Sequence, residues 1–133
     1  MLEITSTTEN AHVPVTIVNV QGEVDASNYQ IFQSQTEALI ANGAQYLLLN
    51  LAEVTYISSA GLRAIHNLFN KLRDIHKDAN DDELRKKMSA GIYKSPYLKI
   101  ANLTSRVKEA FELGGFETYI EVYSDISSAI KSF

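Results

Sequence analysis

The chain has 133 residues, of which 45% are hydrophobic and 21% charged, and its formal net charge at pH 7 is −4. This length and composition suit one folded domain and exclude a disordered or fibrous chain. The absence of cysteine excludes disulfides, thiolate metal sites and a catalytic thiol, and the acidic balance argues against direct nucleic-acid binding.

The first third of the chain predicts two strands with a helix between them. Residues 13–20 are apolar and β-branched, which is typical of a strand. Ser27 and Gln30 match a capping box, so a helix should begin there and end near Gly43. Residues 46–49 are apolar without alternation, as expected of a strand covered on both faces.

The segment VTYISSAGLRAIHNLFNKL, residues 54–72, joins a strand-like run to an amphipathic helix. Apolar side chains recur at helical spacing through residues 62–75, with polar side chains between them. We expect the helix to start near Ser58 or Ser59, because a serine oxygen there can accept a hydrogen bond from a free backbone amide. Gly61 would let the first turn approach another surface closely.

A charged stretch follows, and then strands and helices alternate again. Residues 77–96 are poor in large apolar side chains and carry acid–base pairs at i,i+4 spacing, which predicts an inserted, exposed helix rather than a domain boundary. Strands are predicted at residues 97–101 and 118–122, and helices at residues 104–113 and 124–132. The whole order predicts one α/β domain over residues 1–133, with helices on one or both faces of a sheet.

Motifs for catalysis and for cofactor binding are missing or incomplete. The serine pair lacks the glycine that precedes the nucleophile of an α/β-hydrolase, and His66 lies about two turns along the same helix. No glycine-rich phosphate-binding motif occurs. Residues 78–89 begin like a calcium loop, but Glu83 replaces the required glycine and Ser89 the last glutamate. We expect no enzyme activity, no cofactor and no metal site.

The sequence also predicts where the protein works. The N-terminal residues lack a basic region followed by an apolar core, and no apolar run approaches the ~18 residues of a membrane span. We expect a cytoplasmic protein that inserts into no membrane.

The serine pair has two interpretations on residue chemistry alone. It can be only a cap for the helix that follows. It can also be a phosphorylation site, because a phosphoserine at a helix N-terminus is favoured by the dipole and by free amides. The added charge of roughly −1.5 to −2 would then act on a docked partner rather than on the fold.

Four motifs, in order, resemble the STAS domain of bacterial anti-sigma factor antagonists. They are GEVD at residues 22–25, LLNL at 48–51, VTYISSAGL at 54–62 and LGGF at 113–116. The likeness covers nearly the whole chain from Val13 onward. It implies a STAS-like α/β domain, with a mixed sheet of about four or five strands and helices packed mainly on one side.

The resemblance also implies a function. Family members bind an anti-sigma factor that is a serine kinase; the binding frees a sigma factor, phosphorylation of one serine ends the binding, and a phosphatase resets it. Aligned through the Gly-Leu pair of the third motif, that serine is Ser59. Ser58 is a second candidate acceptor, because the family often has aspartate there. Asp25 matches an acidic position beside the phosphorylation site. The implied partner-binding surface comprises Asp25, Ser58, Ser59, Ala60, Gly61 and Leu62.

Other functions of such a domain stay open at the level of sequence. The chain could be a scaffold component of a stress-signalling assembly, a ligand-sensing module or a subunit associated with a transport system. Residues 77–96 are longer than the usual connection in the family, and they are either a surface excursion or an added partner contact.

Overall fold

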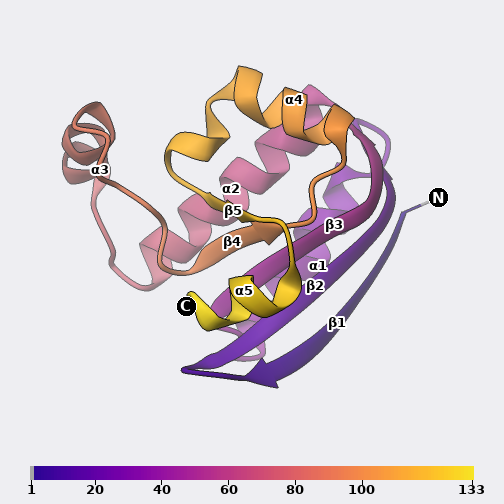
Figure 1. The fold of residues 1–133 in the computed structure, drawn as a ribbon, viewed down its shortest axis with the longest axis horizontal. Coiled ribbons are helices and arrows are strands. Elements are labelled where there is room, and N and C mark those ends of the chain that lie inside the picture. Colours follow the sequence, from indigo (N-terminus) through magenta and orange to yellow (C-terminus); the bar gives the residue numbers. More distant parts are fainter. Residues whose placement is uncertain (1) are drawn as a thin grey trace.

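A computed structural model describes residues 2–133 as five strands and five α-helices (Figure 1). The strands are β1 (Glu3–Asn10), β2 (Pro14–Val24), β3 (Tyr46–Ile57), β4 (Leu98–Ala101) and β5 (Glu121–Tyr123). The helices are α1 (Tyr29–Ala41), α2 (Ser59–Ile75), α3 (Asp81–Ser89), α4 (Ser105–Gly114) and α5 (Ile126–Lys131), with a short 3-10 turn, η1 (Phe116–Thr118). Across residues 2–133, no helix has the length and apolar character needed to cross a membrane.

The strands form one mixed sheet in the order β1-β2-β3-β4-β5. β1 runs antiparallel to β2, whereas β2, β3, β4 and β5 run parallel to one another. Because each parallel strand lies next to the one before it in the chain, right-handed crossovers place the connecting helices on the same face. The mixed five-stranded sheet implied by the resemblance is confirmed.

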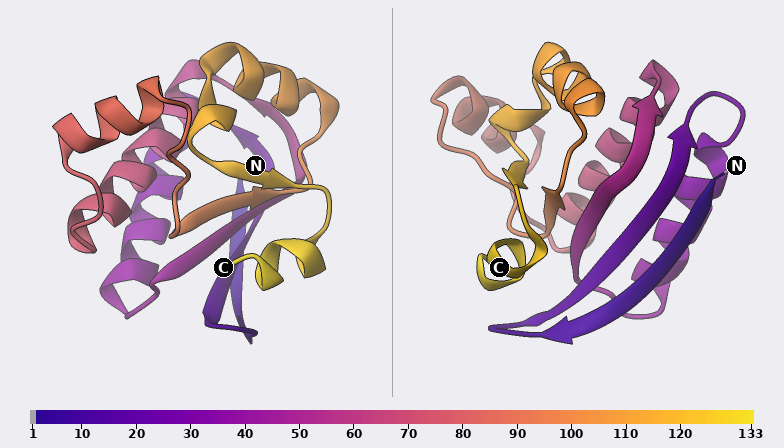
Figure 2. Two further views of the ribbon diagram at one scale, coloured as in Figure 1. Left: turned by 60° about the vertical axis from the view of Figure 1, so that its left-hand side comes forward. Right: turned by 45° about the vertical axis from the view of Figure 1, so that its right-hand side comes forward.

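Successive strand residues enter two different cores, one on each face of the sheet. On one face, Val18 and Leu49 pack with buried side chains from α1, α2 and α4. On the other face, Ile17 and Leu48 pack with Ile130 of α5, which lies across the sheet from α1 and α2 (Figure 2). Coverage on both faces explains why β2 and β3 show continuous apolar runs instead of alternation.

Lys99 of β4 holds α5 against the second face. Its side chain is buried, and Nζ donates hydrogen bonds to the backbone oxygen of Ser132 at 2.8 Å and to the Ser132 hydroxyl at 3.0 Å. Nζ also forms an ion pair with Glu121 Oε1 at 3.1 Å. A buried ammonium needs such partners, since leaving it unpaired would be costly. Lys99 therefore fixes the position of the C-terminal helix.

The edge strand β1 differs from the sequence analysis, which places no strand before residue 13. Its residues pair with β2 at eight positions, from Glu3 opposite Gln21 to Asn10 opposite Pro14. Only Ile4 of the strand is half-buried, and the other side chains are exposed. A strand exposed on both faces has no hydrophobic alternation, so a search for periodicity cannot find it.

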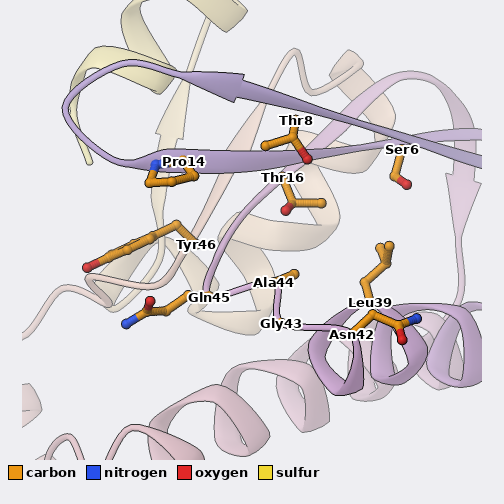
Figure 3. A pocket seen from close by; sticks show the side chains of 10 residues that line it. All are labelled: Ser6, Thr8, Pro14, Thr16, Leu39, Asn42, Gly43, Ala44, Gln45 and Tyr46. Carbon is orange, nitrogen blue, oxygen red and sulfur yellow. The ribbon is translucent and has the colours of Figure 1, made fainter.

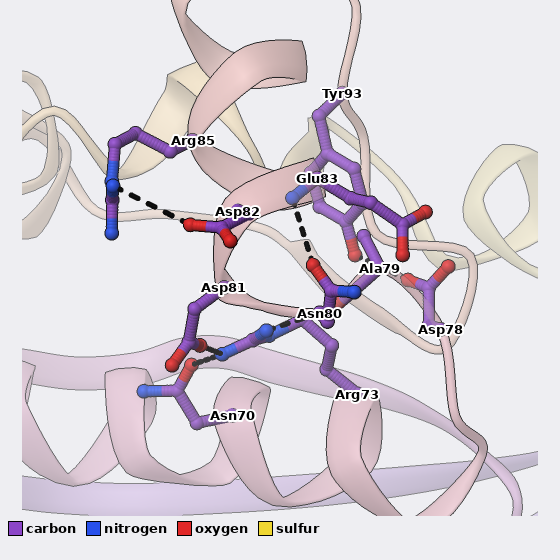
Figure 4. Close-up of polar contacts among 10 residues, drawn as sticks. All are labelled: Asn70, Arg73, Asp78, Ala79, Asn80, Asp81, Asp82, Glu83, Arg85 and Tyr93. Atoms are coloured by element: carbon purple, nitrogen blue, oxygen red, sulfur yellow. Dashed lines mark hydrogen bonds and ion pairs between the residues drawn. The ribbon is translucent and has the colours of Figure 1, made fainter.

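The charged stretch at residues 77–96 contains the expected exposed helix, α3. Arg73 of α2 anchors its start: one guanidinium nitrogen donates to the Ala79 carbonyl at 2.8 Å, and another donates at 2.9 Å to each of the Asn70 and Asp81 side chains (Figure 4). On α3 itself the ion pair is Arg85 with Asp82 at 3.6 Å, at i,i+3 rather than the expected i,i+4 spacing. Arg73 therefore ties the start of α3 to α2.

We predict that Arg73→Ala lowers the free energy of unfolding by about 2 kcal/mol, because three hydrogen bonds of a charged donor are lost. Arg85→Ala is the matched control and should change it by less than about 0.5 kcal/mol, since its partner is a solvent-exposed aspartate. Urea unfolding followed by circular dichroism measures both. Equal effects from the two variants would contradict the anchoring role.

Candidate functional site

The junction of β3 and α2 separates the roles of the two adjacent serines. Ser58 has an extended backbone, with φ −87° and ψ 174°, and is the N-cap of α2. Its Oγ accepts a hydrogen bond from the Gly61 amide at 3.3 Å, and its carbonyl accepts one from the Leu62 amide at 2.9 Å. Ser58 is thus the cap that the sequence analysis expects at one of the two serines.

Ser59 is the first residue of α2, and its side chain is exposed. Its hydroxyl makes no hydrogen bond to any of residues 2–133. The structural cap is therefore supplied by one serine, while the other presents a free hydroxyl to solvent.

The end of β2 lies directly against this junction. Val24 pairs with Ile57 in the parallel ladder, and its carbonyl accepts a hydrogen bond from the Ser58 amide at 2.9 Å. Gly61 is packed so closely that a Cβ there would stand 2.6 Å from the Val24 oxygen and 2.7 Å from Ile57 Cγ1. Only glycine allows the helix to start this near to the strand ends. The structure thus brings the turn at Asp25 and the start of α2 together.

Asp25 is held ionised by its own turn. Its carboxylate accepts hydrogen bonds from the Ser27 hydroxyl at 2.6 Å and from the Ser27 amide at 2.9 Å. The hydroxyl bond is the main reason that the pKa of Asp25 is lowered, and the backbone bond adds to it. The side chain therefore carries a negative charge in the turn beside the start of α2.

The capping box expected at Ser27 and Gln30 is wrong. α1 begins after Asn28, which makes no side-chain cap. Asn28 instead accepts a hydrogen bond from the Asp25 amide and donates one to the Glu23 carbonyl. Ser27 lies one residue before the N-cap position, and its hydroxyl donates to Asp25, so the turn is stabilised from within.

The remaining expected surface residues differ in how far they face solvent. Ala60 is half-buried, and Leu62 is half-buried with its side chain packed against the core cluster on the helix-covered face. Leu62 thus contributes more to the core than to the outer surface. Arg63, the next residue, is exposed.

Two further residues border the junction and were not found from the sequence. The guanidinium of Arg106, in the first turn of α4, lies 5.1 Å from the centre of the Tyr56 ring. Thr104 holds this helix start in place through a hydrogen bond from its hydroxyl to the Val54 carbonyl at 2.9 Å. Tyr56 precedes Ser58 by two residues, but Arg106 is far along the chain, so only the fold reveals the contact.

The histidine in α2 belongs to the core. His66 Nδ1 lies 2.8 Å from the Tyr119 hydroxyl, and burial lowers the His66 pKa. Burial likewise raises the pKa of Tyr119 to about 12. Among residues 2–133, no three histidine, aspartate or glutamate side chains lie close enough to hold a metal ion.

Comparison with known proteins finds relatives of this chain. A family model described as STAS domain matches residues 5–76. BtrV of Bordetella bronchiseptica, provisionally assigned as an anti-sigma factor antagonist, is 26% identical over 117 residues, which is 88% of this chain and 84% of BtrV.

Solved structures show the same fold. A Thermotoga maritima protein, also provisionally assigned as an anti-sigma factor antagonist, has a TM-score of 0.73 at 17% identity, covering 97% of this chain and 92% of that one. The Bacillus cell fate determinant SpoIIAA in its phosphorylated form has a TM-score of 0.61 at 12% identity, covering 96% of this chain and 98% of that one. At these identities the likeness concerns the fold.

The division between the two serines predicts unequal effects on stability. Ser58→Ala should lower the free energy of unfolding by about 1 kcal/mol, because the N-cap bond to Gly61 is lost. Ser59→Ala should change it by less than about 0.5 kcal/mol, since the exposed hydroxyl has no partner. Urea unfolding at pH 7 measures both, and a larger loss for Ser59→Ala would reverse the assignment.

The close packing at Gly61 predicts that alanine at this position destabilises the protein, which is the opposite of its usual effect in a helix. Replacing a helical glycine by alanine normally stabilises a helix by about 0.5–1 kcal/mol. Gly61→Ala should instead destabilise the protein by about 1–3 kcal/mol, because the new methyl group meets a backbone oxygen that cannot move aside easily. Thermal unfolding measures the change, and a raised melting temperature would show that the junction is loosely packed.

Proposed function

The chain belongs to the STAS domain family, and from that premise we propose that it is an anti-sigma factor antagonist released from its partner by phosphorylation of Ser59. The observation that supports this proposal is the division between the two serines. Ser58 caps α2, so modification of the exposed Ser59 removes no structural hydrogen bond. Ser58 is the second candidate acceptor, and its modification would act on the hydroxyl that caps α2.

In the unmodified state, the start of α2 presents only small side chains to the partner. Ser59 and Ala60 have small side chains, and Gly61 holds the turn close to Val24. A partner backbone can therefore come near the helix start. The partner in this proposal is an anti-sigma factor with serine-kinase activity, whose capture by this chain frees the sigma factor.

Phosphorylation would change the charge of that surface with little effect on the fold. Ser59 Oγ attacks the γ-phosphorus of ATP bound to the kinase, its proton passes to a base of the kinase, and the β–γ bond breaks to release ADP. The new phosphate has a charge of roughly −1.5 to −2, and the helix N-terminus favours it. With ionised Asp25 in the adjoining turn, negative charge gathers there and repels an acidic or apolar partner face.

The chain acts in this scheme as a substrate and a binding protein rather than as an enzyme. A separate phosphatase resets it, by hydrolysis of the phosphoserine to serine and inorganic phosphate. No cofactor is needed on this chain for either step. Residues 77–96 are, in the same proposal, a charged insertion in a single STAS-like domain, and the family match ends just before them.

The switch predicts that Ser59→Asp keeps the fold and weakens partner binding. The free energy of unfolding should stay within about 1 kcal/mol of wild type, because an anion is tolerated at a helix start. Affinity should fall by at least about tenfold, which corresponds to 1.4 kcal/mol of repulsion. Tagged wild type and variant would capture the partner from lysate of the source cells, and calorimetry with the purified partner would give the affinities.

The matched control is Ser127→Asp, an exposed serine near the start of α5 on the other face of the sheet. It should bind as wild type does. Phosphopeptide mapping of the recovered wild-type chain should find phosphate at Ser59, and Ser59→Ala should remove it. Normal binding by Ser59→Asp, or phosphate that stays at Ser58 in Ser59→Ala, would contradict the proposal.

A further inference from the structure

The outer edge of β1 is the longest unpaired edge in the sheet. β1 pairs with β2 along one side at eight positions and lies last in the strand order (Figure 1). In an antiparallel ladder, alternate residues direct both backbone groups away from the neighbouring strand. No segment within residues 2–133 pairs with these outward groups. The edge is therefore a row of free donors and acceptors that another strand can meet.

β1 also lacks the usual features that keep strand edges apart. It has no proline and no lysine, its two charged side chains, Glu3 and Glu9, lie toward its ends, and its register with β2 runs from Glu3 to Asn10 without a bulge. The opposite edge of the sheet, β5, has three residues only. Natural proteins protect long exposed edges with prolines, charged side chains, bulges or a covering element. Residues 4–8, in the middle of β1, have none of these features, which favours an interaction through this part of the edge.

The side chains of β1 are suited to strand pairing. Five of the eight are serine or threonine or β-branched isoleucine at residues 4–8, and such residues fit cross-strand pairs. Ser6 and Thr8 point into an open hollow that also receives Thr16 from β2 and Leu39 from α1 (Figure 3). The hollow leaves the side chains of Ser6 and Thr8 exposed beside the edge, although α1 borders it.

We propose that two copies of this chain associate through antiparallel pairing of their β1 strands, about a two-fold axis at Thr7. A two-fold axis perpendicular to a pair of antiparallel strands must pass between a residue and its own copy. Centring on Thr7 sets residues 4–10 of the two copies opposite each other. Thr5 then faces Glu9 and Ser6 faces Thr8, so no two like charges are opposed.

The neighbouring registers are less favourable. Centring on Ser6 sets Glu3 opposite Glu9 twice, and like charges directly opposite destabilise a strand pair. Centring on Thr5 or Thr8 leaves five opposed positions instead of seven. The charge pattern of β1 therefore selects a second copy in one register. This association goes beyond the proposed switch and does not depend on it, because β2 separates β1 from the serine junction.

The first test is sedimentation velocity of the wild-type chain over a series of concentrations up to about 1 mM, so that a weak dimer is detected. We expect a concentration-dependent species of twice the chain mass. Thr7→Glu should shift the protein to monomer at every concentration, because two carboxylates would face each other at the axis. Thr7→Val, which keeps the branched side chain without charge, should remain a dimer. Circular dichroism checks that each variant is folded.

The second test uses the absence of cysteine from the chain, which makes single cysteines specific probes. Mild oxidation should link Thr7→Cys into a covalent dimer, since opposed residues approach closely enough for a disulfide. In the proposed register, the two cysteines of the Ser6→Cys dimer would lie diagonally across the strand pair, about 7 Å apart. Glu9→Cys copies would be offset by about 13 Å along the strands.

The outcomes separate the possibilities. Linkage at position 7 alone supports the proposed register. Linkage at position 6 would overturn it in favour of the other centre, and linkage at position 9 as well as 7 would show parallel pairing. A wild-type chain that is monomeric at all concentrations would overturn self-association, and would leave the edge for a strand of another protein. None of these results bears on phosphorylation of Ser59, so failure here is distinct from failure of the switch.

Discussion

The contact on which the site depends is the parallel pairing of the ends of β2 and β3. Val24 lies opposite Ile57, and one residue later the Ser58 amide bonds to the Val24 carbonyl. The same carbonyl is the atom that a side chain at Gly61 would strike. Two register shifts between β2 and β3 come just before this point, each with one extra residue on β3, and such irregularities bend and re-aim a strand end. Backbone geometry, rather than any long side chain, thus sets Asp25 beside the start of α2.

In the proposed switch, a structural hydroxyl at Ser58 and a regulatory hydroxyl at Ser59 are adjacent without conflict. The cap requires an oxygen at residue 58, and either serine or aspartate supplies one. The STAS pattern often has aspartate there, so serine keeps the cap and removes one negative charge from the turn. The electrostatic change on phosphorylation then depends on Asp25, whose bonds to Ser27 keep it ionised.

Sequence reasoning succeeded where a local motif determines the structure, and it failed where contacts outside the motif determine it. The position of α2 follows from a serine cap and a 3.6-residue period, and the structure confirms both. Ser27 was misread because the hydrogen-bonded turn of Asp25, Ser27 and Asn28 delays the start of α1 to Tyr29. β1 has no buried face and hence no period. Arg106 meets Tyr56 only because α4 packs over the end of β3, and nothing within either segment indicates this.

The strand β2 lies between the two proposed interaction surfaces, which are the free edge of β1 and the junction of β3 and α2. Along one side it pairs with β1, whose other edge is free, and along the opposite side it pairs with β3, whose end leads into the serine junction. The two interactions therefore use different edges and different ends of the sheet. In a dimer formed through β1, each copy would keep its own Ser59 exposed, and neither strand pairing would cover the turn at Asp25. Self-association and partner binding can then occur together, which would place two switches in one assembly and let phosphorylation act on each separately.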